Sequence, residues 1–201
     1  MASSFTRQQL EEWLKTITVK GCVLDVGGSQ NPVIKRLDKT KIFIDEYKIL
    51  DLEQPHEYKQ KPDIVGDLND YYEGDFICPW SDYVDYFDVA FCLEVSEYWY
   101  NPFQALKNIA YLTKPNGVLY SSYHFIYPVH NPPQYDYLRY TPAGVEKLLQ
   151  KTGFRIEEMK PRLVMNIGNL YGWWSREGMR PTKDNYRKHD WAGVLVKATK
   201  L

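Results

Sequence analysis

Short apolar runs recur along the chain and are separated by glycines, prolines or charged residues. The runs at residues 22–26 and 86–92 are nearly continuous, as in strands that are covered on both faces of a sheet. More mixed runs at five further places complete a set of seven predicted strands: 41–45, 63–68, 118–122, 154–159 and 191–198.

Apolar residues at helical spacing lie before and between these strands. The pattern predicts helices over residues 4–16 and 33–37, a third from residue 102 to 112, and a fourth that starts at residue 142 and stops at Gly153. A capping side chain before a proline, the preferred start of a helix, occurs at Asn31-Pro32, Asn101-Pro102 and Thr141-Pro142. Alternating strands and helices predict an α/β fold, a Rossmann-like and mostly parallel sheet with helices on both faces.

The first predicted strand ends in a pair of glycines, Gly27 and Gly28. Glycines permit a sharp turn and let a ligand approach the backbone closely. With a helix start behind the turn, free N–H groups can face polar ligand atoms, as they do in nucleotide sites. A plain turn between strand and helix is the alternative interpretation.

Acidic residues stand where several predicted strands end. Asp45 lies twenty residues after Asp25, about the distance at which an acid holds ribose hydroxyls in dinucleotide-binding folds. Asp67 comes at the end of the third strand, and Glu94 comes soon after the fourth. Because the carboxyl ends of parallel strands meet at one edge of a sheet, these segments predict a single ligand site. A solvent-facing turn residue is the alternative for Asp45.

Composition and charge narrow the class of protein. A 44% share of hydrophobic residues in 201 residues favours one domain, 1–201, with an N-terminal helix in 1–19 and an aromatic, basic insertion at 160–190. A net charge of −1 gives no general attraction to nucleic acids or anionic membranes. The three cysteines lack metal-site spacing, so no metal is expected. The start Met-Ala-Ser-Ser lacks signal-peptide features and no run reaches membrane-spanning length, so a cytoplasmic protein without a membrane segment is expected.

Together these segments resemble the class I S-adenosylmethionine-dependent methyltransferases, of the small, single-domain kind similar to methyltransferase type 11. The similar segments are the Val-Leu-Asp-Val-Gly-Gly motif at 23–28, Gly-Asp-Leu at 66–68, the fourth strand with the three residues after it at 87–95, and the Leu-Thr-Lys-Pro-Asn-Gly turn at 112–117. The resemblance implies a seven-stranded sheet with an antiparallel last strand, S-adenosyl-L-methionine as the cofactor and S-adenosyl-L-homocysteine as the product.

The resemblance also implies roles for single residues. Gly27 and Gly28 are expected to hold the methionine end of the cofactor, and Asp25 to brace their turn from beneath. Asp45 is expected to hold the ribose hydroxyls and Asp67 the adenine amino group. Asp51 is a rival ribose ligand, because the link between the second and third strands is short. The expected cofactor-binding set is Asp25, Gly27, Gly28, Ser29, Asp45, Glu46, Asp67, Leu68, Cys92, Leu93 and Glu94.

The connection over residues 123–140 is long for a simple loop, which makes it a functional candidate. Its second half resembles a pattern in a subset of these enzymes, several of which are linked to sugar or glycan chemistry. His124 and His130 are the candidate general bases, since histidine titrates near neutral pH. The residues expected to contact the acceptor are Tyr98, Tyr123, Asp136, Arg139 and Trp173. A pairing of Asp136 with Arg139 that stiffens the loop is the alternative.

The predicted activity is methyl transfer to a hydroxyl or amine of a small polar acceptor, with a sugar or glycan as one candidate, by a monomer or homodimer. O- and N-methylation both stay open, because an amine that arrives neutral needs no strong base. The second interpretation is methylation of RNA or protein, with phosphate contacts from basic residues near the aromatic segment: Arg162, Arg176, Arg180, Lys183, Arg187 and Lys188. The third is a non-catalytic protein of this fold that binds or regulates a partner.

Overall fold

The chain folds around a seven-stranded sheet with the strand order β3-β2-β1-β4-β5-β7-β6. A computed structural model describes residues 5–55, 59–70, 79–163 and 191–201. The first five strands run parallel to their neighbours, whereas β7 is antiparallel to both β5 and β6. This arrangement confirms the predicted fold class. The strands are β1 Val19–Val26, β2 Ile42–Asp51, β3 Ile64–Val65, β4 Phe87–Cys92, β5 Thr113–His124, β6 Phe154–Leu163 and β7 Trp191–Lys200.

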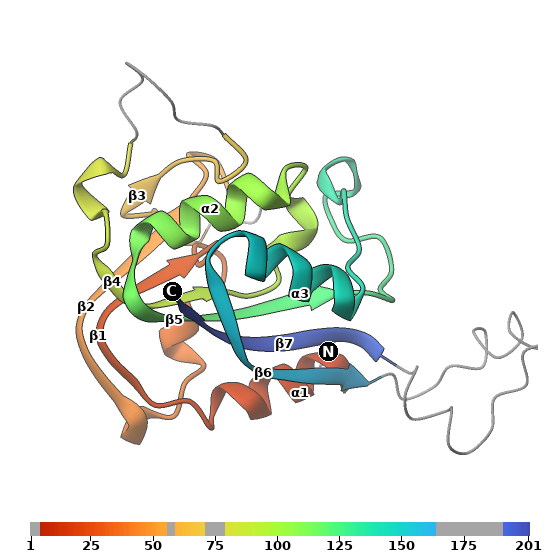
Figure 1. Cartoon of the computed structure of the whole chain (residues 1–201), viewed down its shortest axis with the longest axis horizontal. Helices are drawn as coiled ribbons and strands as arrows, with labels where there is room; N and C mark the ends of the chain where they lie inside the picture. Colours follow the sequence, from red (N-terminus) through yellow and green to blue (C-terminus); the bar gives the residue numbers. More distant parts are fainter. Residues whose placement is uncertain (1–4, 56–58, 71–78, 164–190) are drawn as a thin grey trace, which may run out of the picture.

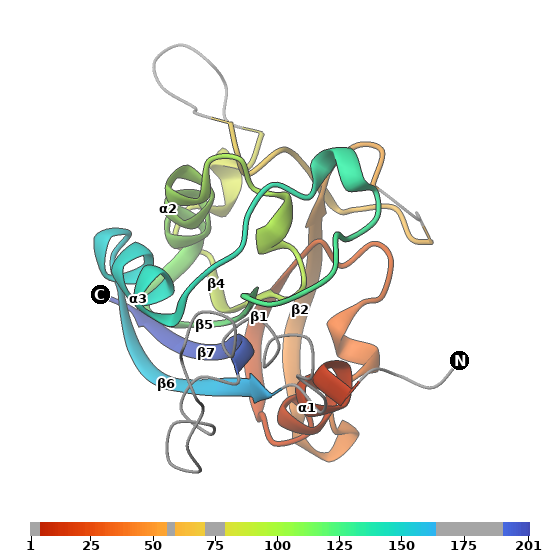
Figure 2. The same ribbon diagram turned by 90° about the vertical axis from the view of Figure 1, so that its right-hand side faces the viewer.

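Helices cover the two faces of the sheet unequally. Helices α2 (Pro102–Leu112) and α3 (Pro142–Lys151) lie on one face, and α1 (Phe5–Leu14) lies on the other (Figures 1 and 2). Leu106 and Ile109 of α2 join the larger hydrophobic core, while Leu10 and Trp13 of α1 belong to a second cluster. Within the described part of the chain, no helix is long and apolar enough to cross a membrane.

Two of the predicted helix starts are confirmed, because the caps form as the sequence indicates. The Asn101 side chain accepts a hydrogen bond from the Gln104 N–H at 3.3 Å, and Thr141 Oγ1 accepts one from the Gly144 N–H at 3.1 Å. Each cap precedes a proline in the first turn. Gly153, with a φ of +89°, comes just after the end of α3 as predicted.

The predicted helix after the glycine turn is wrong. Residues 33–41 form only two short 3₁₀ turns, Val33–Lys35 and Lys39–Lys41. The N–H of Val33 is taken by the Asp25 carboxylate at 2.7 Å, and Asp38 caps the second turn through the Thr40 N–H. The chain therefore turns again before a second helical turn can form.

The second strand is twice as long as predicted, which moves its carboxyl end. β2 spans ten residues and ends at Asp51, so Asp45 lies inside the strand. The short strand β3 pairs only with Leu50 and Asp51, so within the described part of the chain residues 42–48 of β2 have no strand partner on that side. Charged side chains are tolerated along such an open edge, and they therefore do not mark the end of the strand.

Candidate functional site

A cavity of about 1180 Å³ lies beyond the carboxyl ends of the central parallel strands. Its lining runs from Gly27 after β1, Asp51 of β2 and Asp67 after β3 to residues that come after β4 and β5, including Glu94, Tyr98 and His130. The strand order reverses between β1 and β4, with β2 on one side of β1 and β4 on the other. Ligands of open α/β sheets bind at this switch point. The cavity therefore lies where the sequence predicts a ligand site.

The turn after β1 is packed so tightly that it leaves no room for side chains. Gly27 has a φ of +72°, and a Cβ there would lie 2.4 Å from Cγ2 of Val95. A Cβ on Gly28 would lie 2.4 Å from Oδ2 of Asp25. The Gly27 N–H donates to the Leu50 carbonyl at 2.8 Å, which ties the turn to β2. Glycine is therefore required at both positions, because Val95 and Asp25 lie too close to the backbone of the turn for a side chain to fit.

Asp25 supports this turn from behind and does not line the cavity. Its Oδ2 accepts hydrogen bonds from the Val33 N–H at 2.7 Å and from the Tyr47 hydroxyl. Burial raises the pKa of Asp25 to about 6, although both hydrogen bonds act in the opposite direction. Asp25 therefore braces the turn as expected, but its position behind the turn does not fit its place in the expected cofactor-binding set.

Asp51, and not Asp45, occupies the cavity wall at the end of β2. Val26 pairs with Leu50 in the parallel register, which puts Asp51 beside the glycine turn. The Ser29 N–H donates to Oδ2 of Asp51 at 3.2 Å, and partial burial raises the pKa of this carboxyl group. Asp45 is exposed inside β2 and does not line the cavity, so its placement at the strand end is wrong.

Two other predicted residues near the turn also lie off the cavity. Glu46 bonds to the hydroxyl of Tyr86 at 2.5 Å and pairs with Lys48 at 3.0 Å, away from the cavity lining. Ser29 is fully buried, and its backbone carbonyl accepts from the N–H of Gln60 at 3.1 Å. Ser29 therefore holds Asp51 in place instead of lining the cavity itself.

The segment after β3 contributes Asp67 and Leu68 to the cavity, as predicted from its position at a strand end. Oδ1 of Asp67 accepts hydrogen bonds from the backbone N–H and the side-chain amide of Asn69, both at 2.9 Å. Leu68 is almost completely buried. Hydrogen bonds from Asn69 thus fix the Asp67 carboxylate, and the apolar side chain of Leu68 lies beside it.

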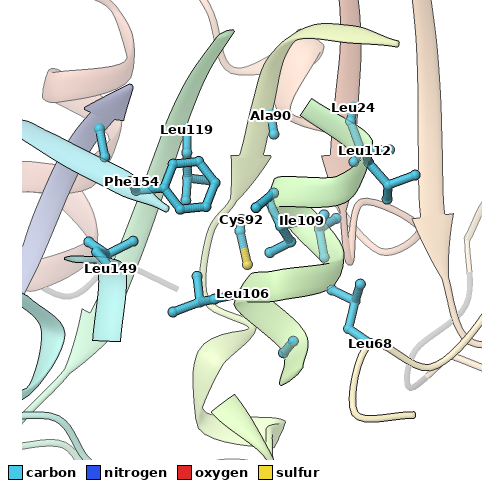
Figure 3. Close-up of a cluster of buried hydrophobic side chains, with 14 of the residues drawn as sticks. Leu24, Leu68, Ala90, Cys92, Leu106, Ile109, Leu112, Leu119, Leu149 and Phe154 are labelled. Carbon is cyan, nitrogen blue, oxygen red and sulfur yellow. The ribbon is translucent and has the colours of Figure 1, made fainter. Parts of the chain in front are cut away.

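After β4, Leu93 and Glu94 line the cavity but Cys92 does not. The side chain of Cys92 points into the core toward Leu106 and Ile109 of α2 (Figure 3). Burial raises the pKa of the Cys92 thiol well above its usual range. The predicted cofactor contact of Cys92 is therefore wrong, because alternate residues of a strand face opposite sides of the sheet.

Glu94 is the centre of a charged cluster. Its Oε1 lies 2.6 Å from Nη1 of Arg162, and its Oε2 lies 3.8 Å from Nη1 of Arg7. Burial alone would raise the pKa of Glu94, but Arg162, together with His124 and Arg7, outweighs it and holds the pKa at about 2. Arg162 is itself only 1% exposed. A phosphate contact by Arg162 is therefore excluded, and the other five basic residues of that prediction lie outside the described residues.

The two candidate histidines have different surroundings. His130 lines the cavity, and its Nδ1 is hydrogen-bonded to the Tyr98 hydroxyl. His124 is only 2% exposed and does not line the cavity; its ring stacks on Tyr127 with centroids 4.1 Å apart. Nε2 of His124 lies 3.4 Å from Oε1 of Glu97. Only His130 of the two is placed where it can contact a ligand.

The loop between β5 and α3 lies on the same side of the sheet as the segment after β4 (Figure 2). Within it, the Arg139 guanidinium binds both carboxylate oxygens of Asp136, at 2.5 and 2.6 Å, and also donates to the carbonyl of Pro128 at 3.0 Å. The hydrogen bond from Arg139 lowers the pKa of Asp136. Neither residue lines the cavity, so the stiffening alternative is the one that the structure supports.

The remaining acceptor candidates are divided. Tyr98 lines the cavity, but Tyr123 is fully buried in the core and packs edge-on against Tyr140. Its predicted contact with an acceptor is therefore wrong. Trp173 lies outside the described residues. Among the residues that are described, no group of three or more histidine, cysteine or acidic side chains could hold a metal ion.

Sequence reasoning missed Glu97, an acidic residue with a completely buried side chain behind the cavity. Oε1 of Glu97 lies near both candidate histidines, 3.4 Å from Nε2 of His124 and 3.7 Å from Nδ1 of His130. Glu97 comes five residues after β4 in a 3₁₀ turn, Ser96–Tyr98. An acid so soon after a buried strand at the switch point was the signal that could have identified it.

Comparison with known proteins identifies relatives of this arrangement. Residues 24–121 match the profile of a family described as a methyltransferase domain. These residues include the glycine turn, Asp51, Asp67 and the segment after β4. No curated protein matches the chain by sequence.

Solved structures share the fold at low sequence identity. A putative methyltransferase from Bacillus halodurans is 14% identical with a TM-score of 0.57, over 96% of this chain and 97% of that one. The Burkholderia thailandensis 1,6-didemethyltoxoflavin-N1-methyltransferase, solved with 1,6-didemethyltoxoflavin and S-adenosylhomocysteine, is 14% identical with a TM-score of 0.59, over 97% and 78%. A putative methyltransferase from Haloferax volcanii, in complex with the Trm112 methyltransferase activator, is 16% identical with a TM-score of 0.59, over 98% and 89%.

The profile match covers the glycine turn and the segments after β2, β3 and β4, and it stops before the loop that carries Tyr127 and His130. Residues 24–121 are therefore a methyltransferase domain, and the strand order with its antiparallel β7 is that of the class I S-adenosylmethionine-dependent methyltransferase fold.

Proposed function

We propose that the protein transfers a methyl group from S-adenosylmethionine to a hydroxyl or amine of a small polar acceptor. The observation that carries this proposal is one continuous cavity, which joins the glycine turn and two strand-end carboxylates to a wall of tyrosines and His130. The first part fits a nucleoside with an amino-acid tail, and the second fits an acceptor. S-adenosylmethionine supplies an activated methyl group when bound.

The cofactor end of the cavity offers donors and acceptors that match S-adenosylmethionine. The Asp51 carboxylate suits two adjacent ribose hydroxyls, as an acid at this strand end does in nucleotide-binding folds. The Asp67 carboxylate suits the adenine amino group, with Leu68 as the apolar surface beside it. Gly27 presents bare backbone to the cavity where the methionine end would lie, and Val95, which fills the place of a Cβ at this position, forms the wall beside it.

The acceptor end of the cavity is aromatic. Of the described residues, five tyrosines line the cavity: Tyr98, Tyr100, Tyr127, Tyr135 and Tyr137. Tyr98 and Tyr127 lie next to His130, whereas Tyr100 packs on Tyr137 near Asp67. Their rings offer apolar faces and their hydroxyl groups offer hydrogen bonds, a combination that suits a compact polar molecule such as a sugar. His130 is the candidate that takes a proton from the acceptor, because it lines this part of the cavity.

The acceptor class can be tested with methyl-labelled S-adenosylmethionine and a panel of sugars, glycosides, amines and phenols. Under this proposal, label passes to at least one small molecule, and the His130→Gln protein transfers it more slowly while still binding S-adenosylhomocysteine. Transfer of label only to RNA or protein would contradict the small-molecule acceptor. Cofactor binding without any transfer across the panel and macromolecules would favour the non-catalytic interpretation.

A further inference from the structure

The surroundings of His130 determine where its ring proton sits. The Tyr98 hydroxyl is hydrogen-bonded to Nδ1 of His130 and lies 2.6 Å from the carbonyl oxygen of Asn131. A carbonyl oxygen can only accept, so the single hydroxyl proton of Tyr98 must point to Asn131. Otherwise two sets of lone pairs would face each other at 2.6 Å. The Tyr98 oxygen therefore accepts a hydrogen bond from Nδ1–H of His130.

Glu97 favours the same position of the proton. Its completely buried Oε1 lies 3.7 Å from Nδ1 of His130, where an acceptor oxygen attracts an N–H and repels a lone pair. The backbone holds Glu97 in place, because its carbonyl accepts from the N–H groups of Tyr137 at 2.8 Å and Leu138 at 3.2 Å. The backbone of Glu97 is therefore tied to the loop between β5 and α3, while its buried carboxyl oxygens have no hydrogen-bond partner among the described residues.

His124 lies on the buried side of Glu97, and it cannot take the place of His130 as the base. Its Nε2 lies between Oε1 of Glu97 at 3.4 Å and Oε2 of Glu94 at 3.5 Å. The ring is 2% exposed and does not line the cavity. His124 thus lies beside the buried Glu97 without a hydrogen bond to it, while His130 is the one of the two histidines that faces the cavity.

Resting on the proposed function, we propose that Glu97 and Tyr98 are positioning residues that keep the ring proton of His130 on Nδ1, so that the Nε2 lone pair serves as the base in methyl transfer. For a hydroxyl acceptor, the oxygen lone pair forms the new bond to the methyl carbon as the carbon–sulfur bond breaks. The electron pair of that bond stays on sulfur, which becomes a neutral thioether. The acceptor proton passes to Nε2 of His130, which becomes an imidazolium ion. A neutral ring with its proton on Nε2 has no lone pair at that nitrogen and could not accept the acceptor proton there.

The tautomer can be observed directly by nitrogen NMR of protein labelled with ¹⁵N-histidine and saturated with S-adenosylhomocysteine, at a pH where the neutral ring predominates. The chain has four histidines, and the His130 signals are those lost in the His130→Gln protein. We expect the protonated-type shift at Nδ1 and the unprotonated-type shift at Nε2. Tyr98→Phe and Glu97→Leu should move the ring toward the Nε2-protonated form, whereas Glu97→Gln, which keeps an oxygen, should restore the wild-type pattern.

Controls separate this positioning role from general damage to the fold. Tyr111→Phe makes the same change on the half-exposed surface of α2 and should leave the His130 signals unchanged. A wild-type protein with the proton on Nε2, or no change in Tyr98→Phe, would overturn the inference. Calorimetry with S-adenosylhomocysteine keeps the two claims apart. Failure to bind it contradicts the proposed function, whereas binding with an Nε2-protonated His130 contradicts this inference alone.

Discussion

At the scale of single residues, the site depends on acidic residues that have different roles although they occupy similar positions near strand ends. Asp25 is buried behind the glycine turn, Asp51 lines the cavity and Glu94 is held ionised by Arg162. All three stand at or just after strand ends. Their roles differ because the strand register decides which side chains face the ligand.

The buried carboxyl group of Asp25 should make stability depend on pH. Its pKa of about 6 lies above the unfolded value of 3.8, so the folded protein keeps this proton when the unfolded chain has lost it. Asp25 therefore contributes most below about pH 4, and this contribution falls as pH rises to about 6, by up to about 3 kcal/mol.

The matched variant for this prediction is Asp25→Asn, which stays neutral. Both hydrogen bonds reach the same oxygen, so the amide oxygen of asparagine can accept them. Chemical denaturation should show that the stability of the wild-type protein relative to Asp25→Asn falls between about pH 4 and pH 6. A difference that stays constant over this range would contradict the assignment.

At the scale of elements, a buried ion pair links α1 to the far edge of the sheet. Arg162 of β6 donates to the Thr6 carbonyl at 3.2 Å and lies 2.6 Å from Glu94. We expect Arg162→Met to lower the free energy of unfolding by about 3–5 kcal/mol, because Glu94 is left without its main partner. Arg155→Met on the same strand removes an exposed pair with Glu157, which solvent screens, and should lower the free energy of unfolding far less.

These two variants are compared by urea denaturation. Equal costs for Arg162→Met and Arg155→Met would show that the buried pair does not hold α1 to the sheet.

The glycine turn offers a second prediction at this scale. Gly27→Ala adds a methyl group 2.4 Å from Cγ2 of Val95, in a backbone conformation with φ of +72°. The turn must therefore shift, and we expect the affinity for S-adenosylhomocysteine to fall at least about tenfold, which corresponds to about 1.4 kcal/mol. Gly153→Ala imposes a similar φ of +89° with nothing within 4 Å, so it should cost about 1–2 kcal/mol of stability and leave binding unchanged. Binding that is equal in the two variants, measured by calorimetry, would contradict the role of the turn.

The elements differ in how far the sequence predicts them. Helices α2 and α3 were predictable because Asn101 and Thr141 cap them locally, each before a proline. The length of β2 was not predictable, since none of the described strands pairs with residues 42–48 on the side of β3, and such an edge tolerates charged side chains. That one difference moved the strand-end acid from Asp45 to Asp51.

At the scale of the whole molecule, the topology accounts for what the sequence could predict of the site. Segments that are far apart in the chain meet at the switch between β1 and β4, so acids at strand ends indicated a common cavity. Side-chain direction could not be predicted in the same way. Cys92 and Tyr123 end in the core, and the buried Glu97 between two histidines became visible only once β4 and β5 were side by side.

The central claim is that the cavity binds the nucleoside of S-adenosylmethionine through the acid at the end of β2. Isothermal titration calorimetry with S-adenosylhomocysteine tests it most directly in the wild-type, Asp51→Asn and Asp45→Asn proteins, which differ only in which acid of β2 is made neutral. We expect binding to weaken about 10- to 100-fold in Asp51→Asn, as the loss of charged hydrogen bonds implies, and to stay unchanged in Asp45→Asn. Unchanged binding in Asp51→Asn, or weaker binding in Asp45→Asn alone, would contradict the account.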